Sequence, residues 1–163
     1  MWAPLAFLGL PVPSRYMRAK LEISSIDEME SFAVQLAQQA RAGDVILLNG
    51  PLGAGKTFLA QALMRALGVS EQVTSPTFVM VKSYRGKLPI HHIDAYRLLD
   101  FPNPRQAFDE LDIELEESLT IIEWGKQFDL TGAALHIEIE IGPGQSRTLT
   151  LEGPDARWGD LQV

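Results

Sequence analysis

The chain has 163 residues, a length that predicts one globular domain. Of these residues 46% are hydrophobic and 21% are charged, which excludes a disordered polar chain. Asp and Glu outnumber Lys and Arg by 21 to 14, and the net charge of −7 argues against direct binding of nucleic acid. The chain has no cysteine, which excludes disulfides, cysteine-ligated zinc, iron–sulfur clusters and thiol catalysis, and fits a reducing cytoplasm.

We expect residues 1–17 to be an N-terminal extension, either disordered or preceding a true translation start at Met17. Residues 18–163 would then form the folded domain. The extension is apolar but short and broken by prolines, so it cannot span a bilayer. It also lacks the basic segment and cleavage site of a secretory signal. We therefore expect a soluble, cytoplasmic protein.

The first part of the domain alternates strands and helices. A short strand is predicted over 20–24, followed by a helix that begins at a capping box on Ser25 and ends near Gly43. Residues 45–48 are a continuous apolar run, typical of a strand buried on both faces. A glycine-rich turn leads from this strand into a helix over 56–67.

The second part is richer in strands. Five are predicted, over residues 78–84, 88–94, 119–122, 135–141 and 147–151. Glycine-containing turns join the first two and the last two into hairpins. The acidic segment 105–117 has a helical pattern, and its carboxylates fit a solvated face or a docking surface. These elements predict an α/β fold with a mixed sheet.

The strongest motif lies between the buried strand and the second helix. Residues 50–57 read GPLGAGKT and match G-x-x-x-x-G-K-[ST] at every fixed position. Glycines allow backbone N–H groups to approach phosphate oxygens, and the helix N-terminus adds its positive dipole. In such loops the lysine, here Lys56, contacts the β- and γ-phosphates, and the hydroxyl, here Thr57, ligates Mg²⁺. We predict a nucleoside triphosphate site in a single P-loop NTPase-like domain, with a mixed central sheet flanked by helices and a C-terminal β-hairpin.

Two acids, Asp94 and Glu123, each end an apolar strand. Open α/β sheets bind ligands at the carboxyl ends of their strands, so either acid is a candidate to hold Mg²⁺ or its waters. The alternative for each is a surface acid at a strand end.

Two aromatic features beside these acids are assigned structural roles. His91 and His92 are adjacent on a strand and point to opposite faces, so we expect a buried histidine that hydrogen-bonds the backbone. Trp124 is assigned to core packing, with stacking on a ligand and contact with a partner as the alternatives.

Four segments, in this order, resemble the TsaE (YjeE) family, the P-loop ATPases of bacterial tRNA threonylcarbamoyladenosine biosynthesis. They are LGAGKT at 52–57, SPTF at 75–78, HIDAYRL at 92–98 and IEW at 122–124. The resemblance runs from residue 20 to the end. It implies ATP and Mg²⁺ as cofactors and weak ATP hydrolysis by the protein alone. It also implies two partner proteins, TsaD-like and TsaB-like, which attach threonylcarbamoyl to the adenosine beside the tRNA anticodon.

The resemblance also implies roles for single residues. Thr57 and Glu123 would ligate Mg²⁺, and Asp94 would act near the attacking water, so the implied catalytic residues are Asp94, Glu123 and Lys56. The implied nucleotide-binding residues are Leu52, Gly53, Ala54, Gly55, Lys56, Thr57, Phe58, Arg147 and Asp27. The implied switch and partner residues are Ser75, Pro76, Thr77 and Trp124.

The chain departs from the family pattern at three positions near this site. Pro51 stands where Asp is usual, Phe58 replaces a second Thr, and Gly125 follows the tryptophan where Pro is usual. The fixed phosphate-binding positions are intact. The glycine that the family commonly has before its acidic segment is not seen around Asp112. This difference bears on partner binding, because the acidic segment over 109–117 is the candidate docking surface.

The motif alone leaves two other functions open. A small-molecule kinase of the P-loop class would carry an arginine-rich lid, which the few basic residues between 70 and 96 support poorly. A nucleotide-dependent scaffold with negligible turnover would use the same residues as an ATPase. The acidic charge indicates that any contact with tRNA is indirect and runs through the partner proteins.

Overall fold

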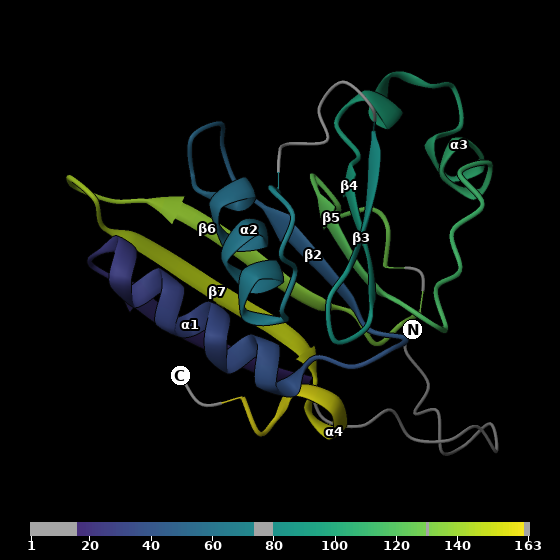
Figure 1. Ribbon diagram of the computed structural model, residues 1–163. Coiled ribbons are helices and arrows are strands. Elements are labelled where there is room, and N and C mark those ends of the chain that lie inside the picture. The colour runs from purple at the N-terminus through teal and green to yellow at the C-terminus, as the bar shows by residue number, and fades with distance from the viewer. Residues whose placement is uncertain (1–15, 74–79, 130, 162–163) are drawn as a thin grey trace, which may run out of the picture.

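The computed structural model describes residues 16–73, 80–129 and 131–161, and one seven-stranded sheet carries the fold (Figure 1). The strands are β1 (Tyr16–Ile23), β2 (Val45–Asn49), β3 (Val81–Arg85), β4 (Pro89–Asp94), β5 (Leu119–Glu123), β6 (Leu135–Ile141) and β7 (Arg147–Pro154). Their order in the sheet is β1-β7-β6-β2-β5-β4-β3. The central strands β6, β2, β5 and β4 run parallel, whereas β1, β7 and β3 are antiparallel to their neighbours. The predicted mixed sheet is therefore confirmed, including its C-terminal hairpin.

The helices divide between the two faces of the sheet. They are α1 (Ile26–Gln39), α2 (Lys56–Ala66), the 3-10 helix η2 (Arg97–Asp100), α3 (Pro104–Asp109) and α4 (Asp155–Trp158). Helices α1 and α2 pack against each other over one face (Figure 1). On β2, Ile46 and Leu48 join the core under these helices, while Val45 and Leu47 join the core on the other face. The buried central strand is thus covered on both sides, as its apolar run predicts.

The first strand is longer than predicted. It begins at Tyr16 rather than at Lys20, because it pairs with β7 along its whole length, from Tyr16 opposite Pro154 to Ile23 opposite Arg147. Tyr16 and Met17, assigned to the extension on sequence grounds, therefore lie in the sheet. The preceding fifteen residues, and the predicted switch residues Ser75, Pro76 and Thr77, lie outside the described residues.

The predicted helix over 105–117 is wrong in its second half. Asn103 caps α3 by accepting a hydrogen bond from the backbone N–H of Gln106, but the helix ends at Asp109. Beyond it, three apolar side chains at every second position pack against the core, namely Leu111, Ile113 and Leu115. The path is irregular rather than helical: the chain turns at residues 110–111 and 115–117, and Asp112 between them has a positive φ of 52°.

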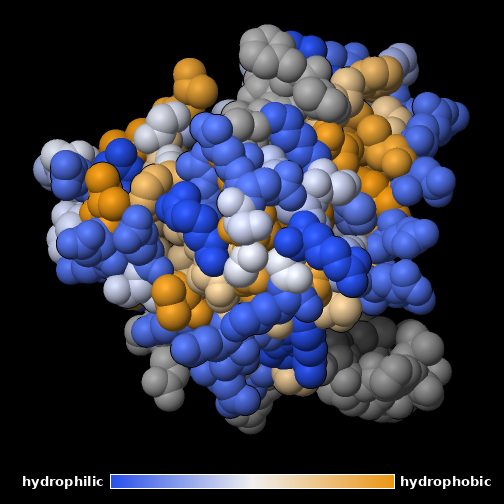
Figure 2. Space-filling model, in the orientation of Figure 1, coloured by the Kyte–Doolittle hydropathy of each residue, from blue (hydrophilic) through white to orange (hydrophobic). Residues whose placement is uncertain are grey.

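The outer surface is mainly polar on the side of α1 and α2, where hydrophilic residues predominate and hydrophobic ones form scattered patches (Figure 2). In the described part of the chain, no helix is both long enough and apolar enough to cross a membrane.

Candidate functional site

The glycine-rich loop joins β2 to α2 at the carboxyl end of the central strands. All three of its glycines, Gly50, Gly53 and Gly55, have positive φ angles, of 150°, 80° and 109°. This backbone is strained for any residue with a Cβ atom, which explains the glycines. Gly55 is the N-cap of α2 and makes no side-chain capping bond, so the first N–H groups of the helix face the loop uncapped. Such a terminus is suited to bind an anion.

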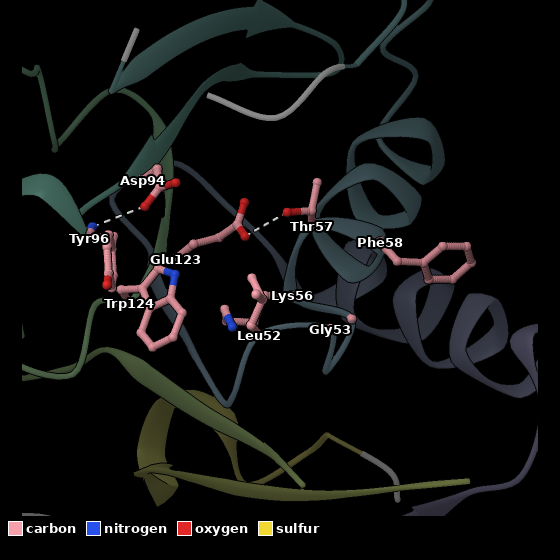
Figure 3. A pocket seen from close by; sticks show the side chains of 10 residues that line it. Leu52, Gly53, Lys56, Thr57, Phe58, Asp94, Tyr96, Glu123 and Trp124 are labelled. Carbon is pink, nitrogen blue, oxygen red and sulfur yellow. Dashed lines mark hydrogen bonds between the residues drawn. The ribbon is translucent and has the colours of Figure 1, made fainter. Parts of the chain in front are cut away.

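A pocket of about 590 Å³ opens beside this loop (Figure 3). Its lining comprises Leu52, Gly53, Gly55, Lys56, Thr57, Phe58, Asp94, Tyr96, Glu123 and Trp124. The structure thus brings the loop together with both acids predicted at the ends of strands. Parallel strands deliver their carboxyl ends to one edge of a sheet, and β4 and β5 follow this rule.

The two acids are neighbours across the sheet, since Asp94 on β4 lies opposite Glu123 on β5. Both are buried, with 8% and 4% of their surfaces exposed. The Thr57 hydroxyl donates a hydrogen bond of 2.7 Å to Oε1 of Glu123, and Oδ1 of Asp94 accepts one of 3.0 Å from the Tyr96 backbone N–H (Figure 3). The acids therefore face the start of α2 from the adjacent strand ends.

Lys56 is buried and turned onto its own loop. Its Nζ donates hydrogen bonds of 2.6 Å to the Gly50 carbonyl and 3.0 Å to the Pro51 carbonyl. The same nitrogen lies 4.0 Å from the centroid of the Trp124 ring, within range of a cation–π interaction. The ammonium group is thus held at the pocket wall by backbone oxygens and an aromatic face.

Two features of the surroundings of Lys56 have opposite effects on its pKa. Burial lowers the pKa of Lys56 below its ordinary value, and the nearby carboxylates of Glu123, Asp94 and Glu138 act in the opposite direction. Burial is the stronger influence, so the ammonium is more acidic than that of a solvent-exposed lysine. A further negative charge in the pocket would favour its protonated form.

His92 differs from its predicted role. The two histidines of β4 do point apart, since His91 Nδ1 contacts the Ser83 hydroxyl at 2.8 Å while His92 is fully buried. However, His92 Nε2 lies 2.6 Å from Oε2 of Glu123, so its partner is a carboxylate and not the backbone. His92 stands two residues before Asp94, so both lie on one face of the strand. This spacing is the feature of the sequence that could have indicated a role for His92 near the acids.

Trp124 is also placed differently from its predicted core position. It has a positive φ of 60°, which turns its side chain out of the β5 direction, and it is only partly buried. Its ring lies 5.1 Å from the Tyr96 ring and lines the pocket. Tyr96, half exposed at the same wall, is a pocket residue that sequence reasoning did not single out.

Arg147, the first residue of β7, contacts the glycine-rich loop. Its Nε donates a hydrogen bond of 3.0 Å to the Ala54 carbonyl, and Nη2 lies 3.5 Å from the Gly53 carbonyl. Nη1 donates to the Ser146 carbonyl at 2.8 Å. The predicted nucleotide-binding arginine therefore contacts the main chain of the loop.

A second pocket, of about 260 Å³, lies on the other side of the loop between the start of α1 and the β6–β7 turn. Ile26, Phe58 and Arg147 are among its lining residues. The Phe58 side chain points away from the acids of the first pocket (Figure 3). Asp27, in the first turn of α1, is exposed and lines neither pocket.

The oxygen atoms around Thr57 fit Mg²⁺ better than a metal that needs a protein cage. Across the described ranges, no cluster of three or more His, Asp or Glu could hold a metal ion. Mg²⁺ is usually held by one or two carboxylates, with waters and phosphate oxygens completing its octahedron. The hydroxyl of Thr57 and the carboxylates of Glu123 and Asp94 are the hard oxygen donors that this mode requires.

Comparison with known proteins identifies the family. Residues 23–149 match the family model of the threonylcarbamoyl adenosine biosynthesis protein TsaE. The chain belongs to the TsaE family. The resemblance seen in the sequence is thereby confirmed.

Individual TsaE proteins are similar over much of the chain. The tRNA threonylcarbamoyladenosine biosynthesis protein TsaE of Streptomyces coelicolor is 38% identical over 144 residues, covering 83% of this chain and 97% of the relative. The protein of that name from Synechocystis is 41% identical over 107 residues, covering 63% and 67%. The crystal structure of Bacillus subtilis YdiB superposes with a TM-score of 0.72 at 27% identity, covering 90% of this chain and 93% of YdiB. The predicted fold class agrees with this neighbour.

Proposed function

We propose that the chain is the ATP-binding and ATP-hydrolysing subunit of a complex that installs threonylcarbamoyl on the adenosine beside the tRNA anticodon. Hydrolysis would drive the partner complex through its cycle. The observation that carries the proposal is the contact between Thr57 and Glu123, in a chain of the TsaE family. A P-loop hydroxyl beside a buried carboxylate supports the proposal, because P-loop proteins hold the metal ion of a bound triphosphate with such a pair.

The chain's own residues would bind and orient the triphosphate. The N–H groups of the loop and of the α2 N-terminus would bind the phosphate oxygens, and Lys56 would move from its backbone partners onto them. Thr57 and Glu123 would hold Mg²⁺, which when bound neutralises charge on the β- and γ-phosphates. Asp94 would orient the attacking water from the adjacent strand end. The nucleoside would lie over the second pocket, beside Arg147 and the first turn of α1, where Asp27 is located.

Two other proteins, TsaD-like and TsaB-like, are the proposed partners. The net charge of −7 disfavours a direct grip on tRNA, so the link to RNA would run through these partners. The acidic segment 109–117, the half-exposed Tyr96 and the partly buried Trp124 beside it are the surfaces proposed for contact with them. The location that this role implies is the cytoplasm.

The proposal is tested by measuring ATP hydrolysis with the two partner proteins and tRNA, combined with a pull-down. We expect stimulation only when both partners are present. Stimulation by a small metabolite alone, with phosphate transferred to it, would support the kinase alternative and overturn the proposal.

Lys56→Ala should abolish tight ATP binding, because it removes the only side-chain cation of the loop motif. Lys20→Ala, an exposed lysine on β1, is the matched control and should bind ATP as the unmodified protein does. Unchanged ATP affinity of Lys56→Ala in a titration would refute the assignment of the loop.

Glu123→Ala should leave nucleotide bound but block turnover in the presence of the partners, because the carboxylate that faces Thr57 is lost. Glu140→Ala, an exposed carboxylate on β6, is the control. The measurement is steady-state phosphate release alongside ATP affinity. Normal turnover of Glu123→Ala would remove this residue from the metal site.

A further inference from the structure

His92 is a fully buried histidine whose polar contact is with the carboxylate of Glu123. It lies in the middle of β4 with no exposed surface, and its Nε2 is 2.6 Å from Oε2 of Glu123 on β5. Glu123 itself is 4% exposed. The pair is therefore shielded from water, where a hydrogen bond to a charged group is stronger than at the surface.

The two oxygens of Glu123 are held from two different elements. Oε1 accepts from the Thr57 hydroxyl at the start of α2, and Oε2 faces His92 on β4. A carboxylate attached to its strand by two methylene groups could adopt several rotamers. Contacts on both oxygens select the one in which Oε1 is directed at Thr57.

The hydrogen-bonding chemistry fixes the direction of the His92 contact. A carboxylate that ligates a metal ion is ionised and can only accept hydrogen bonds, so in the proposed site Nε2 of His92 carries the proton and donates. The other ring nitrogen, Nδ1, is buried and has no hydrogen-bond partner in the part of the chain that the structure describes. The histidine leaves one buried ring nitrogen unpaired and supplies the contact to Oε2 of Glu123, so packing alone does not account for a histidine here.

We propose that His92 is a positioning residue for Glu123, which orients the carboxylate so that Oε1 faces Thr57 and a shared metal ion. The proposal rests on the proposed function, in which Thr57 and Glu123 hold Mg²⁺. Groups that hydrogen-bond a metal ligand from behind orient it and tune the affinity of the site. His92 acts through Glu123 and does not touch the nucleotide, since it is absent from the lining of the pocket.

The test compares three variants in ATP titrations with Mg²⁺ and with a chelator. His92→Leu removes the donor while filling the space. His92→Gln keeps an N–H donor at a similar reach. Ile90→Ala, a fully buried residue on the same face of β4, is the control for loss of packing.

We expect His92→Leu to raise the Mg²⁺ concentration needed for half-maximal tight ATP binding by about 10- to 100-fold, the effect typical of losing such a contact. ATP affinity in the chelator should stay unchanged, because the phosphate-binding loop is intact. His92→Gln should recover most of the Mg²⁺ response. Ile90→Ala should lower the thermal midpoint but leave the Mg²⁺ response as it was.

The outcomes separate the two levels of the argument. A normal Mg²⁺ response in His92→Leu, or an equal shift in Ile90→Ala, overturns the role of His92 and leaves the proposed function standing. If ATP binding by the unmodified protein ignores Mg²⁺, the proposed function fails and this proposal with it. If His92→Leu does not fold, His92→Gln is compared with His92→Asn, whose shorter amide cannot reach Glu123, and an equal Mg²⁺ response in these two overturns the proposal.

Discussion

Gly50, the first residue of the loop, should not tolerate a side chain. Its φ is 150°, and a Cβ atom added there would lie 2.5 Å from the Ile139 carbonyl oxygen and 3.1 Å from the Ala54 Cβ. Both close neighbours are fixed, one by the backbone of β6 and one by the loop itself. Gly50→Ala therefore meets a steric overlap in addition to an unfavourable φ angle.

The magnitude follows from comparison with Gly68, which has a φ of 86° but open space around the added Cβ. Gly68→Ala should lower the free energy of unfolding by about 1–3 kcal/mol, the cost of holding an L-residue in sparsely populated backbone conformations. Gly50→Ala should add the cost of overpacking, about 1–3 kcal/mol, to a similar strain. The two variants should thus differ by about 1–3 kcal/mol.

The assay is urea unfolding followed by circular dichroism, with equal m-values as the condition for comparing midpoints. ATP affinity should fall by about tenfold or more in Gly50→Ala alone, because the added Cβ displaces the loop. A loss of about 1.4 kcal/mol in binding free energy is enough for a tenfold fall. Equal loss of stability in the two variants, or normal ATP affinity in Gly50→Ala, would show that the contact with Ile139 does not constrain the loop.

Two further predictions concern charge. Asp44 accepts hydrogen bonds from Arg157 Nε and from the Arg41 backbone N–H, both 2.8 Å, at the end of β2 opposite the loop. Asp44→Ala should therefore cost about 3 kcal/mol in urea unfolding while leaving ATP affinity unchanged, and a loss under about 1 kcal/mol would contradict a buried ion pair. Burial lowers the pKa of Lys56 from its ordinary 10.5, so ATP affinity should start to fall with rising pH before pH 10.5. Between the lowered pKa and 10.5, the folded protein binds fewer protons at Lys56 than the unfolded protein does. The free energy of unfolding, measured relative to that of Lys56→Met, should therefore rise with pH in this range. If this difference between the two proteins does not change with pH, the lowered pKa is refuted.

The parts of the site that depend on local sequence were predictable. The loop motif specifies its own backbone because glycines stand where φ is positive, as at Gly53 and Gly55. The meeting of Asp94 and Glu123 was predictable because both end apolar strands, and parallel strands end on the same edge. These inferences need only spacing and strand direction.

The contacts that depend on pairing between distant segments were not predictable. His92 and Glu123 are 31 residues apart, and their contact depends on the register of β4 against β5, which neither strand encodes alone. Trp124 lies outside the core because its own φ angle, directly after β5, is positive. A positive φ is unfavourable for a bulky residue such as tryptophan, so the sequence does not predict it. The chain departs from the helical path after α3, with turns and a positive φ of 52° at Asp112, whereas the composition of this segment alone favours a helix.

The contacts of Lys56 have a consequence for how strongly any anion can bind. The Gly50 and Pro51 carbonyls and the Trp124 ring already occupy the ammonium group, so the protein supplies its own competitors for the charge that a phosphate needs. The measured dissociation constant is then the intrinsic one divided by the fraction of molecules whose Lys56 is released. The loop backbone at positions 50 and 51 and the Trp124 ring thereby modulate nucleotide affinity, although neither needs to touch the nucleotide.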